Sequence, residues 1–346
     1  MNKKKLNIAV IGVGHLGKEH ARIYADMPEV NLCGIVDIDR VRGEAVAQRC
    51  NTKFYRSCKE VIGKIDAASV VVPTKYHYEI AKELIENGVN LLVEKPMTGT
   101  ISEAEELIRL SRKKGTVLQA GFIERFNPAI QEIQKLDISL KFIECHRLSP
   151  FTFRSADIGV VLDLMIHDID IILYLSKSKV KKIDAVGVNV ISNREDIANA
   201  RIQFENGCVA NITASRVSFV PMRKIRLFSE DSYISLDYQK QEAIIYRKSP
   251  QLTLKSMNIE DTDVSSIKDL KNFVFGDLLK IEQIKMDNEE PLKKELESFV
   301  NCVRNSEDSI VPGEEGIKAI KTATIIEDEI RRNLKLSNLE RSEGKV

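Results

Sequence analysis

No stretch of this sequence has the ~18 consecutive apolar residues of a membrane-spanning helix, and the lysines before Leu6 lead into a short strand rather than a signal-peptide core. An excess of charge of either sign is also missing, because 52 basic side chains stand against 51 acidic ones. A phosphate-backbone or anionic-membrane partner is therefore not expected. We expect a cytoplasmic protein that acts on a small molecule and binds neither nucleic acid nor membrane.

Cysteine and histidine are too scattered to suggest a metal centre. The cysteines include no CxxC pair, and no group of histidines accompanies them. A zinc or iron–sulfur site would need such a cluster, so no metal is expected. Reduced, mostly structural thiols are the simpler interpretation. The cysteines concerned are Cys33, Cys50, Cys58, Cys145, Cys208 and Cys302.

The length and composition predict two domains. A chain of 346 residues with 43% hydrophobic content is too long for one ordinary domain and has enough apolar residues for two cores. Residues 6–95 alternate short apolar runs with stretches of helical periodicity. This order is typical of an α/β Rossmann domain, a doubly wound parallel sheet with helices on both faces.

The Rossmann domain is expected to span residues 1–121. Gly88 provides the stop of a helix over residues 77–86. Ser102 opens the next helix, with Glu105 as the second half of a capping box, and residues 116–122 form a further strand.

Beyond residue 121 the apolar runs follow one another without a helix between each pair, which predicts antiparallel pairing. Asn206-Gly207 separates two of these runs and is a strong hairpin signal. We expect an α+β domain over residues 122–336 with a mostly antiparallel open sheet, and a flexible tail over 337–346. Its elements are strands near 141–151, 181–192, 199–219, 224–238 and 243–247, an insertion or loop over 249–280, and closing helices over 291–305 and 314–330.

A GxGxxG pattern stands directly after the first strand and opens a helix. In such a turn Gly12 permits the sharp bend, Gly14 allows a pyrophosphate to approach the backbone, and Gly17 lets the helix pack against the strand. The next strand ends in Asp37, where a carboxylate would accept hydrogen bonds from the adenosine ribose. The combination predicts a dinucleotide site. Glycines that merely tighten a turn, with a helix-capping aspartate, are the simpler alternative.

The carboxylate of Asp37 favours NAD over NADP, because it would repel a 2′-phosphate. Arg40 and Arg42 lie nearby in the sequence and could soften this preference. The full set of residues assigned to the cofactor site is Gly12, Gly14, His15, Leu16, Gly17, Asp37, Thr74, His77, Glu94 and Lys95.

Glu94-Lys95-Pro96 ends a strand of the parallel sheet, and ligands of such sheets bind outside the carboxyl ends of their strands. Lys95 is therefore expected to point toward the cofactor cleft, although a lysine before a proline is also a common surface cation.

A strongly apolar helix near residues 160–175 carries polar residues at spacings of four, three and four, which puts them on one stripe: Asp163, His167, Asp170 and Tyr174. A buried network with satisfied hydrogen bonds is one interpretation of this stripe. A hydride-transfer enzyme offers another, since it needs a base, an orienting carboxylate and a cation beside the developing alkoxide. His167, Asp163 and Lys95 fit these three catalytic roles.

The chain resembles the family of glucose-fructose oxidoreductases, inositol dehydrogenases and related sugar dehydrogenases over nearly its whole length. The motifs that carry the resemblance are GVGHLGKEH, VEKPM, GFIERFNP and DLMIHDID. It implies that Lys95, Asp163 and His167 form the catalytic set and that the Lys95-Pro96 bond is cis. The sequence departs from the family's paired glycines at residues 158–161, and Met165 stands at a common glycine position.

Within this family the chain looks most like the dehydrogenases that oxidise the 3-hydroxyl of UDP-N-acetylglucosamine, through ERFNPAI, HRLSPF and the run from Asp196 to Ser218 among others. This likeness implies a 3-keto nucleotide sugar that passes to an aminotransferase for envelope lipid or polysaccharide synthesis, with NAD and no metal. Cations would meet the two substrate phosphates. The candidate substrate-binding residues are Arg125, Asn127, Arg147, Arg154, Asp163 and His167, with Arg216 as a further arginine.

Two alternatives remain open on the sequence. A dehydrogenase of inositol or another free sugar would use the same catalytic set. A non-catalytic NAD-binding regulator would keep the glycine motif and need none of Lys95, Asp163 and His167. The open sheet face of the second domain and the habits of the family favour a homodimer or homotetramer.

Overall fold

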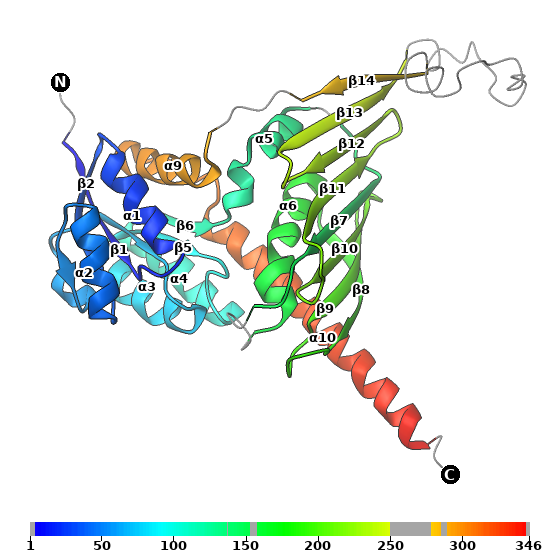
Figure 1. The fold of residues 1–346 in the computed structure, drawn as a ribbon, viewed down its shortest axis with the longest axis horizontal. Coiled ribbons are helices and arrows are strands. Elements are labelled where there is room, and N and C mark those ends of the chain that lie inside the picture. Colours follow the sequence, from blue (N-terminus) through cyan, green and yellow to red (C-terminus); the bar gives the residue numbers. More distant parts are fainter. Residues whose placement is uncertain (1–3, 137, 153–157, 250–277, 285–288, 344–346) are drawn as a thin grey trace, which may run out of the picture. The chain divides into compact units, whose positions relative to one another are not determined.

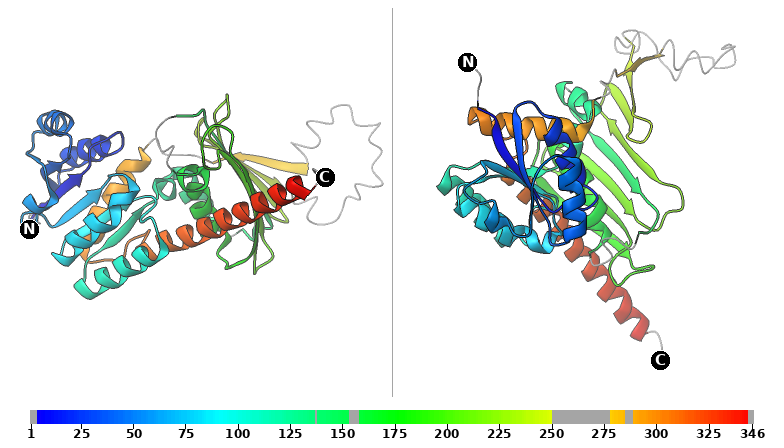
Figure 2. Two further views of the ribbon diagram at one scale, coloured as in Figure 1. Left: turned by 90° about the horizontal axis from the view of Figure 1, so that it is seen from below. Right: turned by 60° about the vertical axis from the view of Figure 1, so that its left-hand side comes forward.

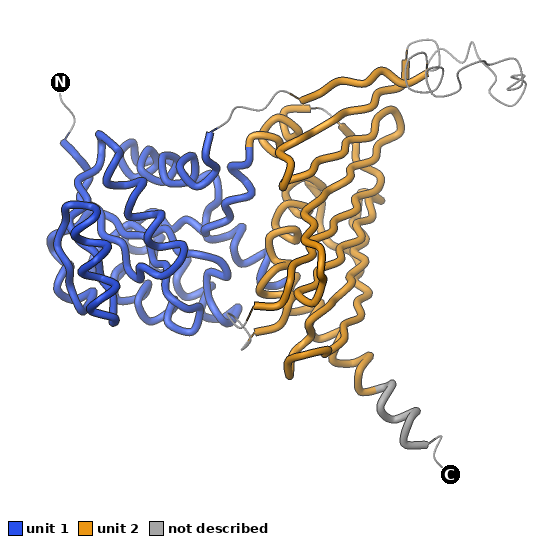
Figure 3. The backbone as a smooth tube through the Cα atoms, viewed as in Figure 1, with its two compact units in different colours: residues 1–127, 289–321 blue, residues 128–288, 322–346 orange. Residues whose placement is uncertain are grey.

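The structure is a computed structural model that describes residues 4–136, 138–152, 158–249, 278–284 and 289–343. The chain forms two compact units, coloured separately in Figure 3. Unit 1 comprises residues 1–127 and 289–321, and unit 2 comprises residues 128–288 and 322–346. Each unit has its own sheet and is described by itself.

Unit 1 contains a six-stranded parallel sheet in the order β3-β2-β1-β4-β5-β6. This is the strand order of a doubly wound dinucleotide-binding fold, so the predicted fold of the first domain is confirmed. The central strands are buried along most of their length because helices cover both faces. The strands are β1 (Leu6–Ile11), β2 (Val30–Val36), β3 (Phe54–Tyr55), β4 (Ala67–Val70), β5 (Asn90–Glu94) and β6 (Leu118–Gly121).

The helices of unit 1 lie on the two faces of this sheet, with α1 and α9 on one face and α3 and α4 on the other (Figure 1). They are α1 (Gly17–Asp26), α2 (Arg40–Arg49), α3 (His77–Glu86), α4 (Ile101–Lys114) and α9 (Pro291–Asn305), with short turns η1 (Cys58–Glu60), η2 (Thr74–Tyr76) and η3 (Ile123–Phe126). The predicted helix over residues 77–86 has these bounds, and Gly88 follows it with a φ of 77°.

The capping box of α4 lies two residues earlier than predicted. The Thr100 hydroxyl accepts a hydrogen bond from the Glu103 N–H, and the Glu103 carboxylate accepts one from the Thr100 N–H. Thr100 is the extended residue that precedes the helix, whereas Ser102 is already helical. The assignment of the box to Ser102 and Glu105 was therefore wrong.

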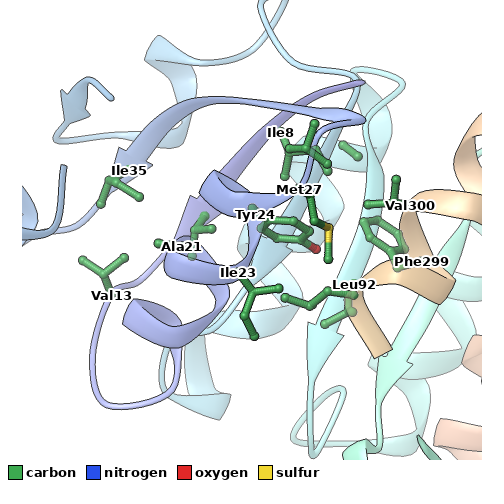
Figure 4. Close-up of a cluster of buried hydrophobic side chains, with 14 of the residues drawn as sticks. Ile8, Val13, Ala21, Ile23, Tyr24, Met27, Ile35, Leu92, Phe299 and Val300 are labelled. Carbon is green, nitrogen blue, oxygen red and sulfur yellow. The ribbon is translucent and has the colours of Figure 1, made fainter. Parts of the chain in front are cut away.

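Helix α9 belongs to the core of unit 1, although the sequence places residues 289–321 in the second domain. Its apolar face carries Leu292, Leu296, Phe299 and Val300, spaced four, three and one residues apart. These side chains pack in the same buried cluster as residues of α1, β1 and β5, as Figure 4 shows. A C-terminal segment thus completes the N-terminal core, a long-range contact that helical periodicity alone does not specify.

Unit 2 contains an eight-stranded sheet in the order β14-β13-β12-β11-β7-β10-β9-β8. All its neighbouring strands are antiparallel except β7 and β10, which are parallel, so the predicted mostly antiparallel sheet is confirmed. The strands are β7 (Phe142–Leu148), β8 (Val180–Val188), β9 (Ile197–Phe204), β10 (Val209–Ser215), β11 (Met222–Phe228), β12 (Ser232–Asp237), β13 (Glu242–Lys248) and β14 (Leu279–Gln283). The predicted insertion over 249–280 lies mostly outside the described residues, but its last residues begin β14.

The predicted hairpin joins β9 to β10, with Gly207 at a φ of 86°.

The helices of unit 2 cover one face of the sheet, with α6 lying across it in Figures 1 and 2. They are α5 (Pro128–Lys135), the π-helical turn η4 (Val161–Met165), α6 (Ile166–Ser176) and the later part of α10 (Gly313–Glu343). Helix α10 runs through most of the predicted tail over 337–346, because no proline or glycine lies between Gly316 and Gly344. The segment predicted as a flexible tail is therefore helical as far as Glu343.

Candidate functional site

The turn after β1 is shaped by its three glycines. Gly12 has a φ of 86°, and a Cβ there would lie 2.7 Å from the carbonyl oxygen of Val71. A Cβ on Gly17 would lie 1.9 Å from the Gly12 carbonyl oxygen, so two of the glycines are required by the packing of the turn itself. A Cβ on Gly14 would meet nothing within 4 Å. Gly14 thus borders open space at a helix N-terminus, where a pyrophosphate fits.

Asp37 follows β2 and is joined to this turn. Its Oδ2 accepts a hydrogen bond from the Val13 N–H at 2.8 Å, and its Oδ1 accepts one from the Asp39 N–H at 2.8 Å. Burial acts to raise the pKa of Asp37, but the Arg42 guanidinium and these N–H groups outweigh it and lower the pKa. Asp37 is therefore a carboxylate held in a fixed position beside the glycine turn.

Arg42 holds the carboxylate of Asp37 with two nitrogens. The Nη2 atom donates to Oδ1 at 2.7 Å and Nε donates to Oδ2 at 3.1 Å. Arg40 instead pairs with Glu44 on the surface of α2. Arg42 is thus hydrogen-bonded to Asp37, whereas the ion pair of Arg40 is with Glu44.

His77 connects the ends of two neighbouring strands. It is buried, with Nδ1 2.9 Å from the Pro96 carbonyl oxygen and Nε2 2.7 Å from the Val72 carbonyl oxygen. Burial lowers its pKa, although the two carbonyl groups act in the opposite direction. His77 therefore fixes the segments that follow β4 and β5. Thr74 lies half-buried in the turn just before it, and His15 and Leu16 are exposed and half-buried in the glycine turn.

The Glu94-Lys95-Pro96 segment ends β5, and the Lys95–Pro96 peptide bond is cis, as the family resemblance implies. Glu94 turns into the core, with Oε1 3.3 Å from Nε2 of the buried His20, while Oε2 accepts a hydrogen bond from the Lys95 N–H. Lys95 itself is half-buried. Glu94 thus fixes the backbone beside Lys95, and sequence analysis missed His20 as its partner.

In unit 2, Asp163 and His167 lie four residues apart on the continuous helix formed by η4 and α6. Both are half-buried, whereas Asp168 and Asp170 are buried. The turn that carries Asp163 is π-helical, with the Ile166 N–H hydrogen-bonded to the Val161 carbonyl oxygen. Turns of this kind occur often at functional sites. Lys95 belongs to unit 1, whereas Asp163 and His167 belong to unit 2.

Two predicted substrate arginines have carboxylate partners within their own unit. Arg125 is buried and lies 3.0 Å from Glu315, and Arg147 is buried and hydrogen-bonded to Asp168 through two nitrogens. Arg216 likewise contacts the buried carboxylate of Asp196. Asn127 lies half-buried at the end of η3, and Arg154 falls outside the described residues.

Within the described ranges, no group of three or more histidine, cysteine or carboxylate side chains could hold a metal ion. The six cysteines are free thiols. None of the helices in the part of the chain described here is both long and apolar enough to cross a membrane.

Models of known protein families match parts of both units. Residues 6–122 match the model of an oxidoreductase family with an NAD-binding Rossmann fold, and residues 141–234 match the GFO/IDH/MocA C-terminal domain. The chain is 38% identical over 244 residues to UDP-N-acetylglucosamine 3-dehydrogenase of Acidithiobacillus ferrooxidans, which covers 70% of this chain and 77% of that protein. It is 29% identical over 234 residues to scyllo-inositol 2-dehydrogenase (NAD(+)) of Bacillus subtilis, covering 62% and 68%.

A solved structure of the Acidithiobacillus ferrooxidans enzyme superposes with a TM-score of 0.83 at 31% identity, covering 95% of this chain and 98% of that one. The likeness therefore extends across both units. The glycine turn, the fixed Asp37 and the open space beside Gly14 fit the cofactor that the family model describes. By sequence, fold and cofactor site, the chain belongs to the GFO/IDH/MocA family of NAD-binding oxidoreductases.

Proposed function

We propose that this protein is an NAD-dependent dehydrogenase that oxidises the 3-hydroxyl of UDP-N-acetylglucosamine to the 3-keto sugar. The product would pass to an aminotransferase, which installs an amino group at that carbon. The likeness to the Acidithiobacillus ferrooxidans enzyme supports this substrate, since it covers 77% of that protein in sequence and 98% of its structure.

One observation in the structure carries the chemistry. Asp163 and His167 are half-buried, whereas Asp168 on the same helix is buried and neutralised by Arg147. Asp168 is therefore a structural carboxylate, and we infer that Asp163 and His167 are the pair that contacts the ligand. A half-buried imidazole oriented by a carboxylate is the arrangement that a general base needs.

In the proposed reaction His167 accepts the proton of the sugar hydroxyl as the carbonyl forms. Asp163 orients the imidazole and stabilises its charged form, and the ammonium of Lys95 donates a hydrogen bond to the developing alkoxide. NAD, when bound, accepts the hydride that leaves the carbinol carbon. The glycine turn would hold its pyrophosphate and Asp37 its adenosine ribose.

The proposal assigns different roles to the predicted substrate arginines. Arg125 and Arg147 are buried with carboxylate partners, so we assign them to the structure of their units. Asn127 is half-buried and keeps its assignment as a substrate contact. Asp163 and His167 are expected to contact the reacting hydroxyl itself.

The test is to mix the purified protein with NAD and UDP-N-acetylglucosamine and follow the absorbance of reduced cofactor, with hydroxylamine present to trap the ketone. Matched reactions contain N-acetylglucosamine, UDP-glucose, myo-inositol or scyllo-inositol. We expect turnover to be greatest with UDP-N-acetylglucosamine. Equal or faster turnover of an inositol would contradict the proposal and favour the activity of the Bacillus subtilis relative.

Two variants test whether the protein is an enzyme rather than an NAD-binding regulator. Lys95→Ala and His167→Ala should each lower kcat by about 100-fold or more, because each removes a group that acts on the reacting oxygen. Both should still bind NAD, which isothermal titration calorimetry measures. Near-normal turnover in both variants would show that the catalytic assignment is wrong.

A further inference from the structure

The first turn of the helix that carries Asp163 and His167 is held by one residue from a distant part of unit 2. The Val160 N–H donates to the backbone carbonyl of Glu195 at 2.9 Å, and the Val161 N–H is 3.4 Å from the Glu195 side-chain Oε1. Glu195 is buried, as are the two valines. A carboxylate at this position also interacts favourably with the positive end of the helix dipole. Glu195 thus caps the start of this helix.

Gly159 makes room for this carboxylate. A Cβ at residue 159 would lie 1.7 Å from Oε1 of Glu195 and 2.3 Å from its Cδ. The φ of Gly159 is not in the left-handed region, so space rather than backbone conformation requires the glycine here. The carboxyl group of Glu195 therefore occupies the space that a side chain at residue 159 would fill, so this position at the start of the helix requires glycine.

The segment that contains Glu195 is itself rigidly fixed. The neighbouring Asp196 is buried, and its Oδ2 accepts backbone hydrogen bonds from residues 190, 191 and 192 at 2.8, 2.6 and 2.9 Å. Arg216 donates to Asp196 through Nε and to the Ile158 carbonyl oxygen through Nη1. Burial acts to raise the pKa of Asp196, but these hydrogen bonds outweigh it and lower the pKa strongly. These contacts hold the backbone at Glu195 in a fixed position.

Glu327 of α10 faces the same carboxyl group. Burial and, to a smaller extent, the charge of Glu195 raise the pKa of Glu327 to about 7, while Arg331 and Arg194 act to lower it. Asp328 also acts to raise it. Glu327 therefore adds a second carboxyl group to the surroundings of Glu195.

We propose that Glu195 is a positioning residue for the dehydrogenase reaction, holding the first helical turn so that Asp163 and His167 keep a productive orientation. The inference rests on the proposed function for its catalytic consequence. Glu195 caps the helix two residues before Asp163 and six before His167. A shift of about 1 Å in reacting groups can cost about 100-fold in rate, so loss of this cap should lower kcat.

The test compares Glu195→Ala, Glu195→Asp and Glu195→Gln with the wild-type protein. Aspartate keeps the charge but is one methylene shorter, so it does not reach the Val161 N–H. Glutamine keeps both the length and an oxygen acceptor. Glu230→Ala is the control, because Glu230 is an exposed carboxylate of unit 2 whose ion pair with Lys141 is distant in sequence from the helix.

The first measurement is hydrogen exchange of peptides that cover residues 158–168, which does not depend on turnover. Protection there should fall by about tenfold in the alanine and aspartate variants and recover in the glutamine variant. The second is steady-state kinetics, in which kcat should fall by about tenfold for alanine and aspartate with the Kd for NAD unchanged. Glutamine should restore kcat, and the control should match wild type in both.

Wild-type exchange and wild-type kcat in the aspartate variant would overturn the proposal. So would a glutamine variant that is as slow as the aspartate variant, because the acceptor oxygen would then not be what matters. Should the wild-type protein turn over no nucleotide sugar, the proposed function fails, whereas the exchange measurement still decides whether Glu195 holds this turn.

Discussion

Arg147 and Asp168 form a two-fold ion pair in the interior of unit 2, with Nε donating to Oδ2 and Nη2 to Oδ1, each at 2.9 Å. Their side chains are only 4% and 5% exposed. The pair joins β7 to α6, the helix that carries His167. It therefore fixes α6 to the sheet through a buried contact.

Removing one member of this pair should strongly destabilise unit 2. We expect Asp168→Asn or Arg147→Met to lower the free energy of unfolding by about 3–5 kcal/mol, because a buried charge is left without its partner. Urea unfolding followed by circular dichroism measures the change. The double variant Arg147→Met/Asp168→Leu should cost less than either single one, and a larger loss in the double variant would contradict the argument.

Gly14 and Gly17 should respond differently to the same substitution. Gly17→Ala forces a Cβ against the Gly12 carbonyl oxygen, so it should lower the free energy of unfolding by about 1–3 kcal/mol. Gly14→Ala meets no protein atom and should leave stability within about 0.5 kcal/mol of wild type. Its methyl group would instead occupy the space for the pyrophosphate, and the Kd for NAD should rise by about tenfold or more.

Thermal unfolding and calorimetric titration with NAD separate these two effects. A stable Gly14→Ala protein with unchanged NAD affinity would show that the open space beside Gly14 is not the pyrophosphate site.

The contact between Asp37 and Arg42 predicts how cofactor preference can be changed. In Asp37→Ser the repulsion of a 2′-phosphate disappears, and Arg42 is released to meet it. The ratio of the Kd for NADP to that for NAD should fall by about 100-fold, since a like-charge contact costs several kcal/mol. Adding Arg42→Ala should reverse most of the gain. Arg40→Ala, which removes a surface ion pair with Glu44, serves as the control and should change neither Kd.

Glu327 predicts a pH dependence of stability. Its pKa in the folded protein is about 7, above the ordinary value of 4.5, so the folded state holds the proton more tightly than the unfolded state. The stabilisation is complete below about pH 4.5 and is lost as the pH rises through about 7. Charged groups that face Glu327 are Glu195, Arg194, Asp328 and Arg331.

Glu327→Gln should flatten this decline, which a series of urea unfolding curves between these pH values measures. Glu329→Gln is a matched control one residue beyond Asp328 on α10, and its curve should follow wild type. An unchanged decline in the Glu327 variant would assign the pH dependence to other groups.

The local parts of this fold could be predicted because their signals are local. The glycine turn, Asp37 at the end of β2 and the Asn206-Gly207 hairpin each depend on residues close together in the sequence. The stripe with Asp163 and His167 follows from helical spacing in the same way. The cis bond before Pro96 came from the family resemblance instead.

The remaining features depend on contacts between distant residues. Arg125 meets Glu315 across 190 positions of sequence, and nothing near Arg125 marks it as a structural cation. Helix α9 was placed in the wrong unit for the same reason, since its apolar face fits any core of suitable shape. Glu195 had no local signal either, apart from the glycine at 159 that makes space for it.

The π-helical turn η4 makes the helix that carries Asp163 and His167 sensitive to the insertion or deletion of a residue. A π turn holds one more residue than the α-helical turn it replaces, and each residue advances an α-helix by about 100°. Deleting one residue between Val161 and Met165 would convert the π turn into an ordinary α-helical turn. It would also rotate the residue at the position of Asp163 by about a quarter of a turn relative to His167. The extra residue thus fixes the register between the carboxylate and the imidazole, so that a change in length here alters which side chain stands beside His167.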